Sequence, residues 1–407
     1  MFKSVLSLTL AAALGTASFG QTTLTAIPGE AAAAKYASIS QEILRAIEKG
    51  NEYLKSKQNP EGYWAQPSYP ALTALAVTAY MRDPANQGKP VPEYIRKGYD
   101  FILKSQKEDG SIFNRGMSSY NTAVCMMALL AANKEEYAPA ILKGRAYLIK
   151  QQNHFAPDNP YNGGIGYGDK QAPPIADLSN TSLALEAIYY SQKLAKDGKY
   201  GEQPDLDWNA ATEFINRCQQ NPAVNKEPWV SNDKSQLGGF VYRPGVSSAR
   251  DKKSAAFDKA EPPKAYGSMT YAGMQSLIYA NVDKNDPRVK LALKWLENSY
   301  SLDENPGMGV QGLYYYYQAM SKALSAMGID TLTLENGRKV DWRDELANKL
   351  ISIQKSDGSW VNTNNRWWEA DPVLVTSYCV LALEQLYHSI RPVTDCHADF
   401  PGRKGRQ

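Results

Sequence analysis

Two stretches of the sequence decide the fold: Gln106-Lys-Glu-Asp-Gly-Ser-Ile-Phe113 and Gln354-Lys-Ser-Asp-Gly-Ser-Trp360. Each follows an amphipathic segment with helical spacing and precedes a run of small and apolar residues. A glycine after a helix adopts the left-handed backbone conformation at little cost, so it can end the first helix and begin a turn. Each stretch therefore predicts a helical hairpin, with the glutamine bonding freed backbone groups in the turn.

The same unit recurs along the chain. Turn glycines recur after 48 residues between Gly62 and Gly110, and after 51 between Gly307 and Gly358. Six copies can be aligned, and we expect a turn aromatic to fold over the hairpin at Trp64, Phe113, Phe240 and Trp360. A single hairpin cannot bury its apolar stripe alone. The pattern predicts an all-α (α/α)6 toroid of six hairpin repeats, with charged outer helices and nearly uncharged inner helices.

These motifs resemble the Gln-Trp repeats of squalene–hopene and oxidosqualene cyclases, and the six-copy period resembles protein prenyltransferase β subunits. The resemblance extends from about Gln41 to Ile390. It implies the squalene-cyclase/prenyltransferase toroid and a central cavity for an isoprenoid-like ligand. This fold carries several unrelated functions, so the motifs are specific for the fold and weak for a reaction.

The resemblance does not extend to the family's catalytic residues. No Asp-x-Asp-Asp acid motif is present. The histidines His154, His388 and His397 do not combine with a cysteine at the start of an inner helix, as the zinc set of the prenyltransferases would require. We therefore expect no metal and no cofactor, and the sequence leaves open whether the protein is an enzyme.

The ends of the chain suggest export. Lys3, the apolar run 5–14 and the small residues Ser18 and Gly20 are typical of a signal peptide. We expect a signal peptide at 1–20, a linker at 21–35, the toroid at 36–391 and a tail at 392–407. The mature protein is then periplasmic or extracellular, without a transmembrane segment. Cys125 and Cys379, each within an apolar helical run, are expected to be buried core residues.

Charge and composition limit the classes of binding partner that the sequence predicts. The chain has 45 basic and 42 acidic residues and no basic stripe, which gives no indication of nucleic-acid binding. Tyrosine is abundant, with 26 residues, and there are 8 tryptophans. Aromatic faces are suited to apolar ligands and to sugars alike. An isoprenoid or other apolar small molecule is the first expectation, and a glycan or a protein partner is the alternative.

Candidate site residues lie where the inner helices begin, because those ends point into the centre of a toroid. Asp177 is a candidate acid, but an Asp at this position is also a good helix N-cap. Glu369, beside two tryptophans, is the second candidate acid. The expected ligand-binding residues are Tyr120, Asn121, Asn180, Tyr266, Tyr314, Trp367, Trp368 and Asp371. Asp371 precedes Pro372 and is equally suited to capping the last helix.

Three functions remain open on these grounds. The first is a squalene-cyclase-like protein that binds an apolar ligand without the known catalytic set. The second is a secreted carbohydrate-active or glycan-binding toroid, which would need two carboxylates flanking a sugar. The third is a non-catalytic scaffold for protein interactions.

Overall fold

The computed structural model describes residues 29–168, 175–249 and 262–390, with side chains from residue 36 onward. The described chain is mostly helical with little strand, which confirms the predicted all-α class. The even-numbered helices are α2 (Pro70–Arg82), α4 (Ser118–Ala131), α6 (Leu178–Lys196), α8 (Gly267–Tyr279), α10 (Leu313–Met327) and α12 (Pro372–Ile390). The odd-numbered helices are α1 (Gly29–Ser56), α3 (Glu93–Lys104), α5 (Ala138–Lys150), α7 (Trp208–Cys218), α9 (Pro287–Asn298) and α11 (Trp342–Ser352).

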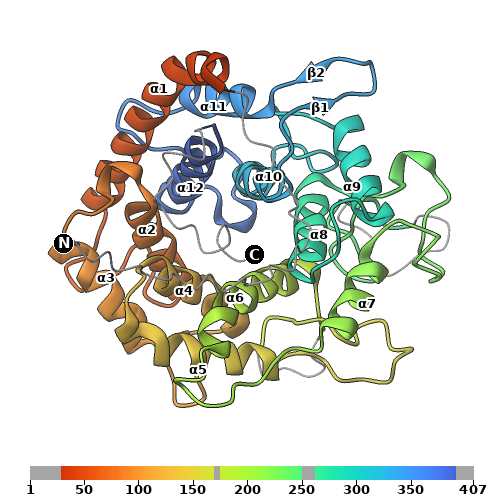
Figure 1. Cartoon of the computed structure of the whole chain (residues 1–407), viewed down its shortest axis with the longest axis horizontal. Coiled ribbons are helices and arrows are strands. Elements are labelled where there is room, and N and C mark those ends of the chain that lie inside the picture. The colour runs from red at the N-terminus through yellow and green to blue at the C-terminus, as the bar shows by residue number, and fades with distance from the viewer. Residues whose placement is uncertain (1–28, 169–174, 250–261, 391–407) are drawn as a thin grey trace, which may run out of the picture.

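Short elements complete the described chain. Four 3-10 turns are η1 (Pro84–Asn86), η2 (Glu135–Tyr137), η3 (Lys234–Gln236) and η4 (Arg366–Trp368). Strands β1 (Leu332–Thr333) and β2 (Lys339–Val340) pair antiparallel, with Leu332 opposite Val340. They form a small hairpin between α10 and α11, away from the centre of the molecule (Figure 1).

The even-numbered helices form a closed ring. In chain order each packs against the next, from α2 through α4, α6, α8 and α10 to α12, and α12 packs against α2. The odd-numbered helices lie outside them (Figure 1). Helix α3 packs on α2, α5 on α4 and α6, α7 and α9 on α8, and α1 and α11 on α12. The inner helices therefore have one side facing the outer helices and one side facing the centre.

Sequence composition explains this division. The outer helix α3 is strongly amphipathic, with Ile95, Tyr99 and Ile102 buried while its basic and acidic residues are exposed. Helix α2, by contrast, is buried from Pro70 to Ala79. A helix that is apolar nearly all round is stable only when it is surrounded by other elements. The inner positions thus follow from the apolar runs.

The motif glutamines tie neighbouring hairpins together. Gln354 Nε2 donates to the carbonyl oxygens of Gly358, at 3.0 Å, and of Ala46 in α1, at 2.9 Å. The first bond belongs to its own turn, as predicted, and the second links the last hairpin to the first. The same pair of bonds, to its own turn glycine and to the next outer helix or its N-cap, is made by Gln58, Gln106, Gln152 and Gln219.

The expectation that a turn aromatic folds over the hairpin is wrong for Phe113, in the second hairpin. Trp64, Phe240 and Trp360 are buried as expected, but Phe113 is partly exposed and Ile112 is buried in its place. Except after Gly307, where Gly309 takes this place, the buried residue is the second after the turn glycine, so its position is fixed and an aliphatic side chain also fits. Its backbone N–H donates to a threonine of the following inner helix: Thr73, Thr122, Thr181, Thr270 or Thr376.

The described residues test some of the segment boundaries that were predicted from the sequence. Helix α1 begins at Gly29, so residues 29–35 of the expected linker are helical. The expected signal peptide and the tail, with Cys396 and His397, lie outside the described residues. Cys125 and Cys379 are buried thiols, as predicted, and Cys218 is a buried thiol as well. Within the described part of the chain, no helix combines the length and apolar character needed to cross a membrane.

Candidate functional site

Asp177 lies at the start of α6, and it acts as the N-cap of that helix. Its Oδ1 accepts the backbone N–H of Asn180 at 2.8 Å, and its Oδ2 accepts the Asn180 side-chain amide at 2.8 Å. The hydroxyl of Tyr242 is a further hydrogen-bond partner of the carboxylate. The N-cap expected from the sequence is therefore present, and the carboxylate is hydrogen-bonded to both Asn180 and Tyr242.

The surroundings of Asp177 favour its protonated form. Burial raises the pKa of this carboxyl group to about 6, although hydrogen bonds from Asn180 and Tyr242 and the nearby charge of Arg243 oppose the shift. Removing a carboxylate from water disfavours its charged state, which explains the direction. Asn180 Oδ1 is buried without a hydrogen-bond partner in the described structure. The role of Asp177 as an acid stays a prediction.

A layer of tyrosines crosses the ring near the same ends of the helices. Tyr120 of α4 is hydrogen-bonded to Tyr378 of α12, and Tyr315 of α10 is hydrogen-bonded to Ser179 of α6. The rings of Tyr315 and Tyr378 lie with centroids 6.0 Å apart. Burial raises the pKa of all three phenols. We call Tyr120, Tyr315 and Tyr378, together with Ser179, the tyrosine layer.

Below this layer, one face of each of several inner helices stays accessible. On α10, Tyr315, Gln318 and Lys322 are partly exposed at helical spacing, while neighbouring positions are buried. Helix α4 shows the same pattern, with Tyr120 and Met127. Since α4 packs against α2, α6 and α5, its remaining face is directed toward the centre of the ring. Accessible side chains on that face indicate space inside the ring.

We call this space the central hollow. Its upper boundary is the tyrosine layer, and burial raises the pKa of Tyr120 and Tyr315 even though both rings keep accessible surface. The inner-helix residues that keep accessible surface on this side are Tyr120, Met127, Ser179, Leu183, Tyr315, Gln318 and Lys322.

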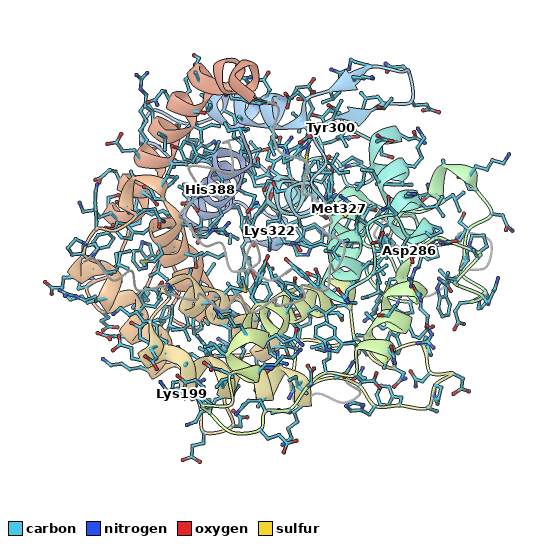
Figure 2. All side chains as sticks on the ribbon, in the orientation of Figure 1. Lys199, Asp286, Tyr300, Lys322, Met327 and His388 are labelled. Carbon is cyan, nitrogen blue, oxygen red and sulfur yellow. The ribbon has the colours of Figure 1, made fainter. Side chains whose placement is uncertain are left out.

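An ion pair that the sequence analysis did not identify joins the inner helices α6 and α10. Lys322 Nζ of α10 lies 2.5 Å from Glu186 Oε2 of α6, with side-chain exposures of 20% and 7%. Figure 2 shows Lys322 inside the ring of inner helices. The sequence did hold a signal, because Glu186 and Lys322 are among the few charged residues of the inner helices.

Glu369, the second candidate acid, caps another inner helix. Its carboxylate accepts the backbone N–H groups of Tyr315, at 2.8 Å, and of Tyr314, at 3.4 Å, at the start of α10. Asn362 Nδ2 donates to it at 2.7 Å. Burial raises the pKa of Glu369, and these hydrogen bonds oppose the shift. Its observed partners are those of a buried helix cap.

Other predicted ligand residues are also engaged with protein. Asn121 Oδ1 accepts the N–H of Ala71 at 3.0 Å, joining α4 to α2. Tyr314 donates its hydroxyl to the carbonyl of Val361 at 3.2 Å. Tyr266 is buried and hydrogen-bonded to Ser248. Of the predicted set, Tyr120 is the residue that reaches the central hollow with accessible surface.

Trp367 and Trp368 lie at the surface, at the same end of the ring as Asp177. They are 46% and 43% exposed, and both have positive φ angles, 55° and 64°. Trp368 contacts Tyr69 with ring centroids 4.7 Å apart. A positive φ is uncommon for a bulky residue. Asp371 follows them and accepts the N–H of Val373 at 2.8 Å, so it caps α12 as the sequence suggested.

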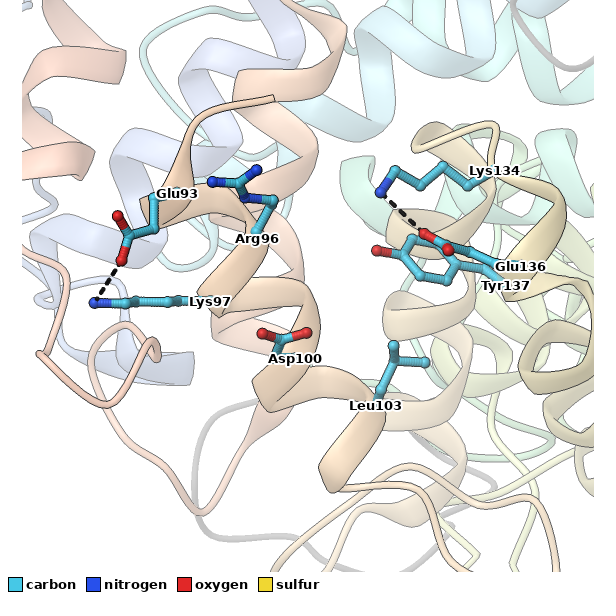
Figure 3. Close-up of a pocket in the computed structure, with 8 residues that line it drawn as sticks. All are labelled: Glu93, Arg96, Lys97, Asp100, Leu103, Lys134, Glu136 and Tyr137. Carbon is cyan, nitrogen blue, oxygen red and sulfur yellow. Dashed lines mark hydrogen bonds and ion pairs between the residues drawn. The ribbon is translucent and has the colours of Figure 1, made fainter. Parts of the chain in front are cut away.

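A groove on the outside of the ring is a poor match for an apolar ligand. It encloses about 510 Å³ between α3 and η2, and it is lined by Glu93, Arg96, Lys97, Asp100, Leu103, Lys134, Glu136 and Tyr137. Its charges pair locally, Lys97 with Glu93 and Lys134 with Glu136 (Figure 3). Among the described residues, no group of three or more His, Cys, Asp and Glu side chains could hold a metal ion.

Comparison with known proteins supports the fold. No protein-family model matches the chain. A variant of type II terpene cyclase MstE from Scytonema, in complex with its substrate geranylgeranyl dihydroxybenzoate, is 10% identical, with a TM-score of 0.51 over 87% of this chain and 99% of that chain. The apo enzyme gives 10% identity and a TM-score of 0.51, over 86% and 99%. At this identity the likeness shows an all-helical, terpene-cyclase-like fold and does not extend to activity.

Proposed function

We propose that this chain is a six-hairpin toroid of the squalene-cyclase/prenyltransferase type that binds an isoprenoid-like molecule in the central hollow. The observation that carries the proposal is the partly exposed apolar side chains of Met127 and Leu183 on the central side of α4 and α6, beneath the tyrosine layer. An apolar chain in contact with these side chains is removed from water, which is worth about 25 cal/mol per Å² of buried apolar surface.

The polar groups of the site are suited to orienting such a ligand. Tyrosine hydroxyls and Ser179 can bond to a polar group at one end, and aromatic faces cover the chain. The MstE structures support this choice, because the substrate in one of them carries a geranylgeranyl chain. Without an Asp-x-Asp-Asp motif in the sequence, binding is proposed and cyclisation is not.

A blocking substitution tests the proposal. We expect Leu183→Trp to weaken the binding of farnesol at least tenfold, because the indole fills the hollow beside α6. Equilibrium dialysis with radiolabelled farnesol measures this. Leu237→Trp is the control, since Leu237 is exposed outside the ring, and its affinity should equal that of the wild type.

Two results would contradict the proposal. One is wild-type protein that binds no farnesol, which would direct attention to glycans or to protein partners. The other is equal binding by Leu183→Trp and the wild type, with both folded by circular dichroism, which would place the ligand elsewhere.

A further inference from the structure

We propose that the surface turn before α12 is a binding site for a neutral polysaccharide, with Trp367 and Trp368 as its stacking platform. The turn comprises residues 361–370, contains η4, and lies at the end of the ring where the inner helices begin. Its ligand differs in kind from the apolar molecule of the central hollow. The inference therefore goes beyond the proposed function and does not depend on it.

The backbone of this turn is strained at both tryptophans. Trp367 and Trp368 have φ angles of 55° and 64°, in the left-handed region that bulky residues adopt only at an energetic cost. Their side chains are nevertheless 46% and 43% exposed, so burial of the rings does not compensate for the strain. Strained residues persist where the surrounding structure determines them, and they are concentrated at ligand-binding sites. Strain and exposure at two adjacent residues together indicate a binding site.

Buried polar groups hold the turn in place. The Glu369 carboxylate accepts the backbone N–H of Tyr315 at 2.8 Å and the side-chain amide of Asn362 at 2.7 Å. The backbone N–H of Asn362 donates to the carbonyl oxygen of Glu369 at 2.9 Å, which joins the two ends of the turn. A turn that is already fixed in the free protein loses little conformational entropy when a ligand binds.

Each indole ring is also held by a neighbouring residue. Trp368 packs against Tyr69, with ring centroids 4.7 Å apart. The guanidinium carbon of Arg366 lies 4.4 Å from the centroid of the Trp367 ring. Gly312 makes room for the same ring, since a Cβ atom there would lie 3.0 Å from two carbon atoms of the indole. The rings are therefore oriented before a ligand arrives, and both keep exposed surface.

The exposed side chains of the turn are uncharged. Of its two charged residues, Glu369 is buried, and Arg366 is half-buried and donates from Nη1 to Gln311 Oε1 at 2.5 Å. A pyranose ring has C–H groups on its faces, which suit an aromatic ring, and hydroxyl groups at its edge, which suit amide and hydroxyl side chains. Besides the two tryptophans, the exposed residues of the turn are Thr363, Asn365 and Ala370.

This composition favours a sugar chain over two other classes of ligand. Anionic membrane surfaces and nucleic acids attract exposed lysine and arginine side chains. Within residues 361–370, all of which the structure describes, no basic side chain is fully exposed. Exposed indoles beside an uncharged amide and an uncharged hydroxyl therefore match a polysaccharide without charge.

Affinity electrophoresis tests the site, in native gels that contain hydroxyethylcellulose, galactomannan or dextran. We expect at least one of these neutral polysaccharides to retard the wild type. The double variant Trp367→Ala/Trp368→Ala should bind that polysaccharide at least tenfold more weakly, because both stacking faces are removed. Trp367→Tyr/Trp368→Tyr should recover most of the affinity, since phenol rings also stack on sugars.

An exposed aromatic residue elsewhere provides the control. Phe155 lies in the loop after α5 and is 38% exposed, so Phe155→Ala should be retarded as strongly as the wild type. Circular dichroism establishes whether the double variant is folded. Should it fail to fold, Asn365→Ala still tests the site, because it removes an exposed amide of the same turn and should weaken binding at least threefold.

Three results would overturn this inference. One is a wild type that none of the three polysaccharides retards. Another is equal retardation of the wild type and the folded double variant. The third is a wild type that sediments with vesicles of phosphatidylcholine and phosphatidylglycerol, through the two tryptophans, and ignores the polysaccharides, which would make the turn a membrane contact. Each of these results leaves farnesol binding in the hollow to its own test.

Discussion

Gly358→Ala is expected to lower the free energy of unfolding by about 3 kcal/mol or more, through backbone strain and a steric clash. Gly358 has a φ of +87°, a backbone angle that residues other than glycine adopt only with strain. A Cβ atom there would lie 2.3 Å from the carbonyl oxygen of Lys49 in α1. Because that contact is with backbone, helix α1 would have to move away from the last hairpin. Urea denaturation followed by circular dichroism measures the loss.

Gly337→Ala separates the two causes. Gly337 also has a positive φ, +79°, but a Cβ atom there meets nothing within 4 Å. Strain alone predicts a loss of about 1 kcal/mol. If both variants lose the same stability, the close approach between the last turn and α1 is not a structural constraint, and this explanation of how the ring closes is wrong.

Asp177→Asn is expected to remove a pH dependence of stability. The folded pKa of Asp177 is raised from 3.8 to about 6, so between these values the folded state binds the proton more tightly than the unfolded state. Asp177 therefore contributes to the free energy of unfolding at acidic pH, and this contribution is lost as the pH rises through about 6. A shift of about two units at 1.36 kcal/mol each corresponds to roughly 3 kcal/mol.

Asparagine is suited to this test because it also caps helices well. The unpartnered Oδ1 of Asn180 can accept a hydrogen bond from the new amide after a side-chain flip. We expect the variant to be at least as stable as the wild type at pH 7 and relatively less stable at pH 4. Asp207→Asn, at the exposed N-cap of α7, is the control for the cap alone. A wild-type pH profile in Asp177→Asn would contradict the account.

The turn chemistry made the ring of hairpins largely predictable. Gln354, Gly358 and the buried residue two positions later recur because each hairpin needs the same turn. The error at Phe113 arose because the motif was read as aromatic, whereas the structure requires only a buried side chain at a fixed distance from the glycine. The backbone N–H of this buried residue donates a hydrogen bond to a threonine hydroxyl, as that of Ile112 does to Thr122. This threonine also recurs in the sequence and could have been recognised.

The site was less predictable because its contacts join distant parts of the chain. Asp177 could be interpreted from its local sequence, since an N-cap binds within its own helix. Glu369 could not, because it binds the start of α10, 54 residues before it. The Lys322–Glu186 pair spans 136 residues, and its depth in the ring depends on how two helices align. Local pattern carries no information about that alignment.

A crystal structure of the protein with farnesol is the most direct test of the central claim. The account predicts ligand density inside the ring, in contact with Leu183 beneath the tyrosine layer. Density confined to the outer surface, such as the charged groove on α3, or a ring interior occupied only by the protein's own side chains, would contradict it.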